Sequence, residues 1–150
     1  MNAKNYLSQL SYYEDLVLMK NAEARHYLSL ATAINVGTGN LGTVVQSSAI
    51  TDRTGNYAAA FVDAQAEAEA ILDEYVRLRQ TIQKQLEGLI ERDEEGNILD
   101  DRYYKVLHLH FLQNMTFADV AETMHRSMKS VFNFYKEALT RFEELYSPFY

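Results

Sequence analysis

The chain has 150 residues, a formal net charge of −7 and a single proline, Pro148, close to its C-terminus. It has no cysteine, which excludes a disulfide framework, a thiolate metal site and a thiol nucleophile and makes the cytoplasm, a reducing compartment, the expected location. No apolar run approaches the ~20 residues that a membrane span needs, so we expect no membrane association. Because almost nothing in the chain interrupts a helix, we predict an all-α fold.

The N-terminal part of the chain carries two helical patterns. From residue 3 to residue 34, apolar residues recur at alternating steps of three and four, at Tyr6, Leu10, Tyr13, Val17, Ala24, Tyr27, Ala31 and Ile34, with Lys20 as the polar member. Heptad spacing returns with Phe61, Ala64, Ala68, Ile71, Tyr75, Leu78, Ile82, Gln85 and Leu89. Such spacing is typical of helices packed along their length, so residues 1–92 are predicted to form a long antiparallel helical hairpin, a coiled coil.

The two predicted helices are separated by residues 35–56, which contain four glycines among Asn, Ser and Thr and are predicted to form a flexible loop. Gly37, Gly39 and Gly42 match the pattern G-x-G-x-x-G, but no strand is predicted before them, so we expect no nucleotide there.

The predicted hairpin also has apolar residues outside its seam, at Leu7, Leu16, Met19 and Leu30. One partner helix leaves such a face uncovered. We therefore expect a homo-oligomer, most simply a homodimer, through the hairpin.

The last third of the chain is predicted to contain three shorter helices. An acidic linker at 93–100 precedes them, and the first helix runs from after Asp100 to about Gln113. Thr116 is expected to cap the second helix and Ser127 the third. The inward residues of the third helix are predicted to be Val131, Phe134 or Tyr135, Ala138 and Phe142, and the aromatic residues at 146–150 are predicted to form a loose tail. A supporting helix followed by a helix, a short turn and a helix is the helix-turn-helix layout, here at 101–150.

Within this part, the sequence TFADVAETM at 116–124, followed by SMKSV at 127–131 and by Ala138 and Leu139, resembles region four of bacterial sigma factors. The layout of the whole chain is similar to that of a family of small phage and prophage proteins, a group that includes the ArpU-type regulators of phage late genes. The resemblance implies a phage-encoded regulator of transcription that binds double-stranded DNA in the bacterial host, with host RNA polymerase as a further partner.

The outward face of the predicted third helix carries candidate DNA contacts. Asn133 can bind adenine through two hydrogen bonds, and Lys129 and Lys136 can contact guanine edges or phosphates. The predicted DNA-binding residues are Arg126, Ser127, Met128, Lys129, Phe132, Asn133 and Lys136, with Arg102 and Lys105 on the flanking backbone.

A second interpretation stays open because this face has only two lysines and includes the apolar Phe132. In it, the module contacts RNA polymerase or another phage protein and the acidic hairpin provides spacing. We expect no enzymatic activity and no metal or other cofactor, because no nucleophile, base and orienting group are apparent and His108 and His110 lie on opposite faces of a helix. His125 occupies the turn position where glycine is usual, which costs strain if its φ is positive.

Overall fold

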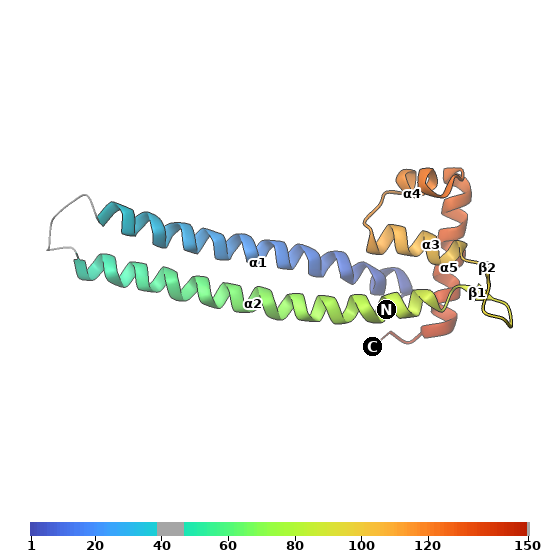
Figure 1. Ribbon diagram of the computed structural model, residues 1–150, viewed down its shortest axis with the longest axis horizontal. Coiled ribbons are helices and arrows are strands. Elements are labelled where there is room, and N and C mark those ends of the chain that lie inside the picture. The colour runs from blue at the N-terminus through green and yellow to red at the C-terminus, as the bar shows by residue number, and fades with distance from the viewer. Residues whose placement is uncertain (39–46, 150) are drawn as a thin grey trace. The chain divides into compact units, whose positions relative to one another are not determined.

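The computed structural model describes residues 1–38 and 47–149, and these are mostly helical (Figure 1). The elements in chain order are α1 (Ala3–Thr38), α2 (Ser47–Glu87), β1 (Glu91–Arg92), β2 (Ile98–Asp100), α3 (Arg102–Leu107), the π-helix η2 (His108–Leu112), α4 (Phe117–Met124) and α5 (Met128–Tyr146). The chain divides into two compact units, unit 1 from Met1–Tyr12 and Tyr75–Tyr150 and unit 2 from Tyr13–Glu74. None of the described helices combines the length and the apolar character needed to cross a membrane.

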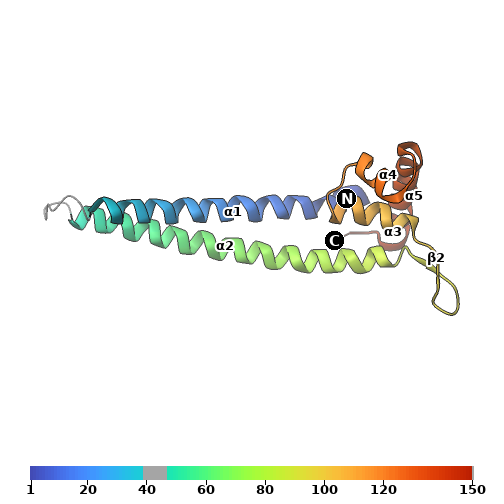
Figure 2. The ribbon, with the colours of Figure 1, turned by 45° about the horizontal axis from the view of Figure 1, so that its top comes forward.

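Unit 2 consists of one segment of α1 and one of α2, which lie side by side and run in opposite directions (Figures 1 and 2). Its buried side chains are Ala24, Ala31, Ala64 and Ala68. Alanines at these positions let the two helix backbones approach closely, and they occupy predicted seam positions. Lys20 joins the helices through an ion pair of 2.7 Å with Glu67. The side chain of Ile34 lies outside the described part of the chain.

The prediction of a loop at residues 35–56 is wrong for most of these residues, because they are helical. Helix α1 continues to Thr38, and α2 begins at Ser47 and passes through Gly55. A glycine inside a helix costs only ~1 kcal/mol relative to alanine, which the packing of a long helix outweighs. Of the glycine pattern, Gly39 and Gly42 lie outside the described residues.

The core of unit 1 is built from the start of α1, the end of α2 and the C-terminal helices. Its fully buried larger side chains are Leu7, Leu10, Ile82, Leu86, Val106, Leu107, Val120, Val131 and Phe142. The sequence predicted that Leu7 belongs to an exposed apolar face, and this prediction is wrong. The side chain is fully buried because the C-terminal helices supply the surface that covers it. The boundary between the two units does not lie at the predicted linker, residues 93–100. Residues 1–12 form one unit with residues 75–150.

A short β-hairpin occupies the position of the predicted acidic linker. Strands β1 and β2 pair antiparallel, with Glu91 opposite Asp100. In the turn, the Asp93 carboxylate accepts hydrogen bonds from the backbone N–H groups of Asn97 (2.8 Å) and Glu95 (3.0 Å). These bonds stabilise the charged form and lower the pKa of Asp93. Strands of two and three residues are too short to produce a detectable alternation in the sequence.

The C-terminal aromatic residues pack into unit 1, so the prediction of a loose tail is wrong. Phe149 is buried, and its ring stacks on Tyr6 at a centroid distance of 4.8 Å and on Phe142 at 5.5 Å. The tail therefore closes the core against the first turns of α1.

Phe142 offers a direct test of this core. Phe142→Ala should lower the free energy of unfolding by ~3–5 kcal/mol, because it removes a fully buried ring. Leu145→Ala, on the same helix but at an exposed position, should change it by less than ~0.5 kcal/mol. Denaturant unfolding of both variants measures the difference. Equal effects would contradict the assignment of Phe142 to the core.

Candidate nucleic-acid interface

The first helix of the candidate interface, α4, begins after the cap residue that the sequence predicted. Thr116 caps it, with Thr116 Oγ1 accepting a hydrogen bond of 3.2 Å from the backbone N–H of Asp119. Its buried residues Val120 and Ala121 belong to the same core as Val131 of α5, and the two helices are in contact. The small Ala121 permits a close approach of the two helices.

The turn between α4 and α5 is closed by backbone hydrogen bonds. Arg126 N–H donates to the carbonyl of Ala121 (3.0 Å) and His125 N–H to that of Glu122 (3.2 Å). This is the Schellman pattern of a helix C-terminus, which needs a left-handed residue just after the helix. His125 supplies it with φ = 54° and ψ = 43°, so the expected strain at this non-glycine residue is present.

Helix α5 separates its faces as the sequence predicted. Val131, Tyr135, Ala138 and Phe142 are its buried residues, and of the two aromatic alternatives Tyr135 is the one that turns fully inward. All seven predicted DNA-binding residues are exposed. Ser127 caps the helix by accepting a hydrogen bond from Ser130 N–H (3.1 Å), and its hydroxyl also contacts Ser130 Oγ (3.0 Å). These bonds occupy the hydroxyl of Ser127, one of the predicted DNA-binding residues.

The exposed face of α5 contains an aromatic contact that the sequence did not reveal. Lys136 Nζ lies 4.5 Å from the centroid of the Phe132 ring, which positions the ammonium group by a cation–π interaction. Phe132 in turn meets the edge of Phe117, the first residue of α4, at 5.7 Å. Phe117 was missed because its half-buried position follows from a helix crossing and not from a periodic pattern.

The two cations predicted on the flanking backbone already have partners. Arg102 forms a bidentate ion pair with Asp100, with a shortest distance of 2.6 Å, and this interaction lowers the pKa of the Asp100 carboxyl. Lys105 pairs with Asp101 at 3.3 Å. Arg126 forms no ion pair with any described residue. It lines, together with Arg102, Lys105 and His125, a groove of about 390 Å³ beside the start of α5.

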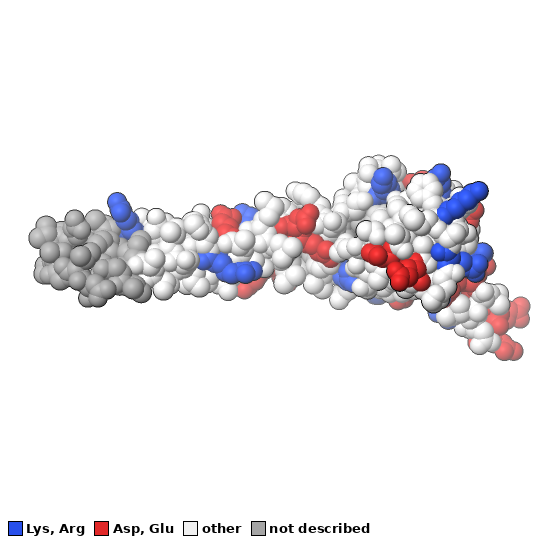
Figure 3. Space-filling model, turned by 90° about the horizontal axis from the view of Figure 1, so that it is seen from above, with Lys and Arg blue, Asp and Glu red and all other residues white. Residues whose placement is uncertain are grey.

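Both signs of charge occur at this end of unit 1. Lys and Arg side chains spread over the part that carries α3, α4 and α5, acidic side chains lie among them, and a further acidic group lies at the tip of the β1–β2 hairpin (Figure 3). Along α5 the N-terminal half of the exposed face carries Lys129 and Lys136, and Glu137 and Glu144 follow them. The start of α5 is thus its most favourable region for an anionic ligand.

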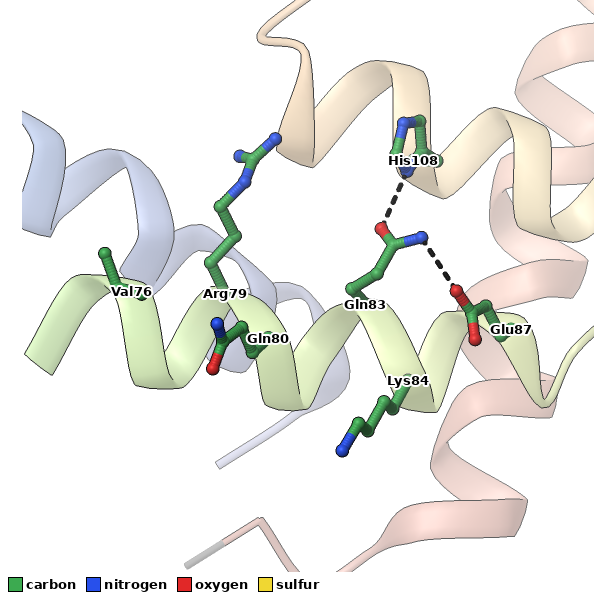
Figure 4. Close-up of a pocket in the computed structure, with 7 residues that line it drawn as sticks. All are labelled: Val76, Arg79, Gln80, Gln83, Lys84, Glu87 and His108. Carbon is green, nitrogen blue, oxygen red and sulfur yellow. Dashed lines mark hydrogen bonds between the residues drawn. The ribbon is translucent and has the colours of Figure 1, made fainter.

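A second hollow, of about 780 Å³, lies between α2 and the α3–η2 segment (Figure 4). Gln83 Nε2 donates to Glu87 Oε1 (3.1 Å) and to the Tyr104 hydroxyl (3.0 Å), which leaves its Oε1 facing His108 Nδ1 at 3.1 Å. Nδ1 therefore carries the proton. His108 Nε2 accepts from Gln113 Nε2 at 3.3 Å, so the ring is neutral in this network. Burial and then the charge of Arg79 lower the pKa of His108.

In the part of the chain that the structure describes, no group of three or more His, Asp or Glu side chains could hold a metal ion. His110 contacts the backbone, with Nδ1 2.9 Å from the carbonyl oxygen of Met115, and stacks on Phe117 at 4.4 Å. Comparison with known proteins gives no match to a family model, a curated protein or a solved structure.

The turn strain can be measured by substitution. His125→Gly should raise the free energy of unfolding by ~0.5–1 kcal/mol, because glycine adopts the left-handed conformation without the ~1–2 kcal/mol penalty but loses more freedom on folding. His125→Val should lower it. Denaturant unfolding decides, and a destabilised glycine variant would show that the histidine ring contributes more than its backbone costs.

Stability should also fall when His108 is protonated. Its folded pKa lies below the ordinary value of 6.5, so the unfolded chain binds the proton first and the stabilisation is lost as pH falls below ~6.5. His108→Gln should therefore reduce the difference in unfolding free energy between pH 7.5 and pH 5.5. Equal pH dependence in the wild-type and variant proteins would contradict the assignment.

Proposed function

We propose that residues 101–150 form a helix-turn-helix that binds double-stranded DNA, and that the chain is a phage-encoded transcriptional regulator. The observation that carries the proposal is the two-sided character of α5. One face is buried by Val131, Tyr135, Ala138 and Phe142, while Lys129, Asn133 and Lys136 are exposed and follow a capped helix start. A major groove of about 12 Å admits one helix presented in this way.

Each exposed residue has a chemical role in this proposal. Asn133 is the base-reading residue, since its amide can donate to and accept from one adenine. Lys129 and Arg126 neutralise phosphates, and Arg126 is free of ion pairs with the described residues. Lys136 is held against Phe132, which fixes its direction and reduces the entropy lost when it binds an anion.

A second candidate function rests on the apolar members of the same face. Met128 and Phe132 are both exposed, at 56% and 43%, and two such side chains are better suited to a protein partner than to phosphate. In this alternative the module is an adaptor that contacts RNA polymerase or another phage protein.

DNA titrations separate the two functions. With prophage intergenic DNA, Asn133→Ala should cost ~1–3 kcal/mol and relax the preference at one base position. Lys129→Ala should weaken binding to all sequences and reduce the slope of log K against log salt by ~1. Arg141→Ala is the matched control, because it removes an exposed α5 cation that is paired with Glu144.

The adaptor function predicts the opposite pattern. DNA affinity should then be unmeasurable at ~100 mM salt, and Phe132→Ala should abolish a polymerase pull-down while Asn133→Ala leaves it intact. That combination of results would exclude DNA reading.

A further inference from the structure

The groove of about 390 Å³ beside the turn between α4 and α5 has an apolar side and a polar side. The apolar side is formed by half-buried side chains that pack against the core of unit 1, namely Tyr104, Leu109 and Met124. A hollow of roughly 300–1,000 Å³ with apolar walls and a few polar groups is the usual form of a small-molecule site. We call this space the turn groove.

The polar side of the turn groove supplies hydrogen-bond donors. Neither the His125 ring nor the Arg126 guanidinium has a hydrogen bond or an ion pair with any described residue. Lys105 pairs with Asp101 at 3.3 Å, an exposed contact that engages one of the three N–H groups of the ammonium. Arg102 also lines the groove but is held by its bidentate ion pair. His125, Arg126 and Lys105 are therefore the side chains available to an anion.

Two irregular pieces of backbone meet at the turn groove. His125 adopts the left-handed conformation, with φ = 54°, at a position where glycine would carry no steric penalty. Leu109 belongs to the π-helix η2, a rare conformation that is frequent at functional sites. Strained non-glycine residues also cluster at such sites, where the side chain has a role that offsets its cost. Both irregularities thus place side chains in the same groove.

The second histidine of the turn groove, His108, contributes rigidity and no charge. Its ring stacks on that of Tyr104 at a centroid distance of 5.3 Å. Gln83 lies 3.1 Å from its Nδ1 and Gln113 lies 3.3 Å from its Nε2, and these bonds hold the neutral form. The apolar side of the groove is therefore fixed in place before any ligand arrives, which favours binding.

We propose that the turn groove binds a small phosphate monoester. Its phosphate accepts hydrogen bonds from His125, Arg126 and Lys105. Its apolar body lies against Leu109 and Met124. A phosphate monoester carries nearly two negative charges near neutral pH and three acceptor oxygens, which matches these donors better than a single carboxylate does. The groove shares Arg126 with the residues proposed to contact DNA, but its occupation does not require DNA.

Titration of the full-length chain with phenyl phosphate and with inorganic phosphate, at constant ionic strength, tests the site. Phenyl phosphate should shift the backbone N–H resonances of residues 125 and 126. It should bind roughly tenfold more tightly than inorganic phosphate, since burial of about 55 Å² of apolar surface corresponds to that factor. Equal affinities, or unchanged resonances at these two residues, would overturn the proposal.

One consequence of the site rests on the proposed function. If Arg126 also neutralises a DNA phosphate, phenyl phosphate should weaken DNA binding more than inorganic phosphate does at the same ionic strength. A chain that binds phenyl phosphate but no DNA would contradict the proposed function and support the groove site. A chain that binds both without competition would show that Arg126 is not shared between them.

Two substitutions separate ligand binding from stability. His125→Gly should weaken phenyl phosphate binding about fivefold, although it relieves the strain of the turn, so lower stability cannot explain the loss. Arg126→Ala should weaken it roughly tenfold or more, because it removes a charge-assisted donor. Arg141→Ala is the matched control, since it removes an exposed α5 cation outside the groove, paired with Glu144, and should leave the affinity unchanged. Circular dichroism verifies folding. Wild-type affinity in either groove variant, or equal weakening by Arg141→Ala, would overturn the proposal.

Discussion

The core of unit 1 depends on the first twelve residues of the chain. Leu7 and Leu10 insert fully buried side chains among residues of α2, α3 and α5, each worth ~1.5–3 kcal/mol of apolar burial. Two hydrogen bonds fix the segment, one of 2.8 Å from the backbone N–H of Ala3 to Glu143 Oε1 and one of 2.9 Å from the Tyr6 hydroxyl to Gln85 Oε1. The C-terminal helices therefore have a complete core only in the presence of a segment more than 90 residues earlier in the sequence.

Periodic features were predictable from the sequence, and features set by distant contacts were not. The heptad positions of both long helices, the caps Thr116 and Ser127 and the inward face of α5 follow from local spacing and local hydrogen bonding. The burial of Leu7 and Phe149 depends on surfaces supplied by other parts of the chain, which no local pattern encodes. The end of α1 and the start of α2 could not be predicted from glycine content, because the packing of long helices outweighs the cost of a glycine within them.

The candidate interface combines predicted residues with an unpredicted support. The π-helix η2 carries His110, which stacks on Phe117, and Phe117 meets both Tyr135 and Phe132. These rings connect the segment before α4 to the exposed face of α5. The position of Phe132, and through it that of Lys136, is therefore set by buried aromatic contacts and not by solvent-exposed side chains alone.

The nesting of unit 2 within the sequence of unit 1 has a consequence for the order of folding. Unit 2 is one continuous segment, Tyr13–Glu74, whereas unit 1 is assembled from two pieces on either side of it. When the two helices of unit 2 pair, they hold the flanking pieces at a short effective separation, which removes most of the entropy of closing a loop of about 60 residues. During synthesis on the ribosome, the first twelve residues emerge early but find their core only after α5 and Phe149 have followed. Until then the core around Leu7 and Leu10 is incomplete, and early pairing of the unit 2 helices keeps the two flanking pieces close together while the core is completed.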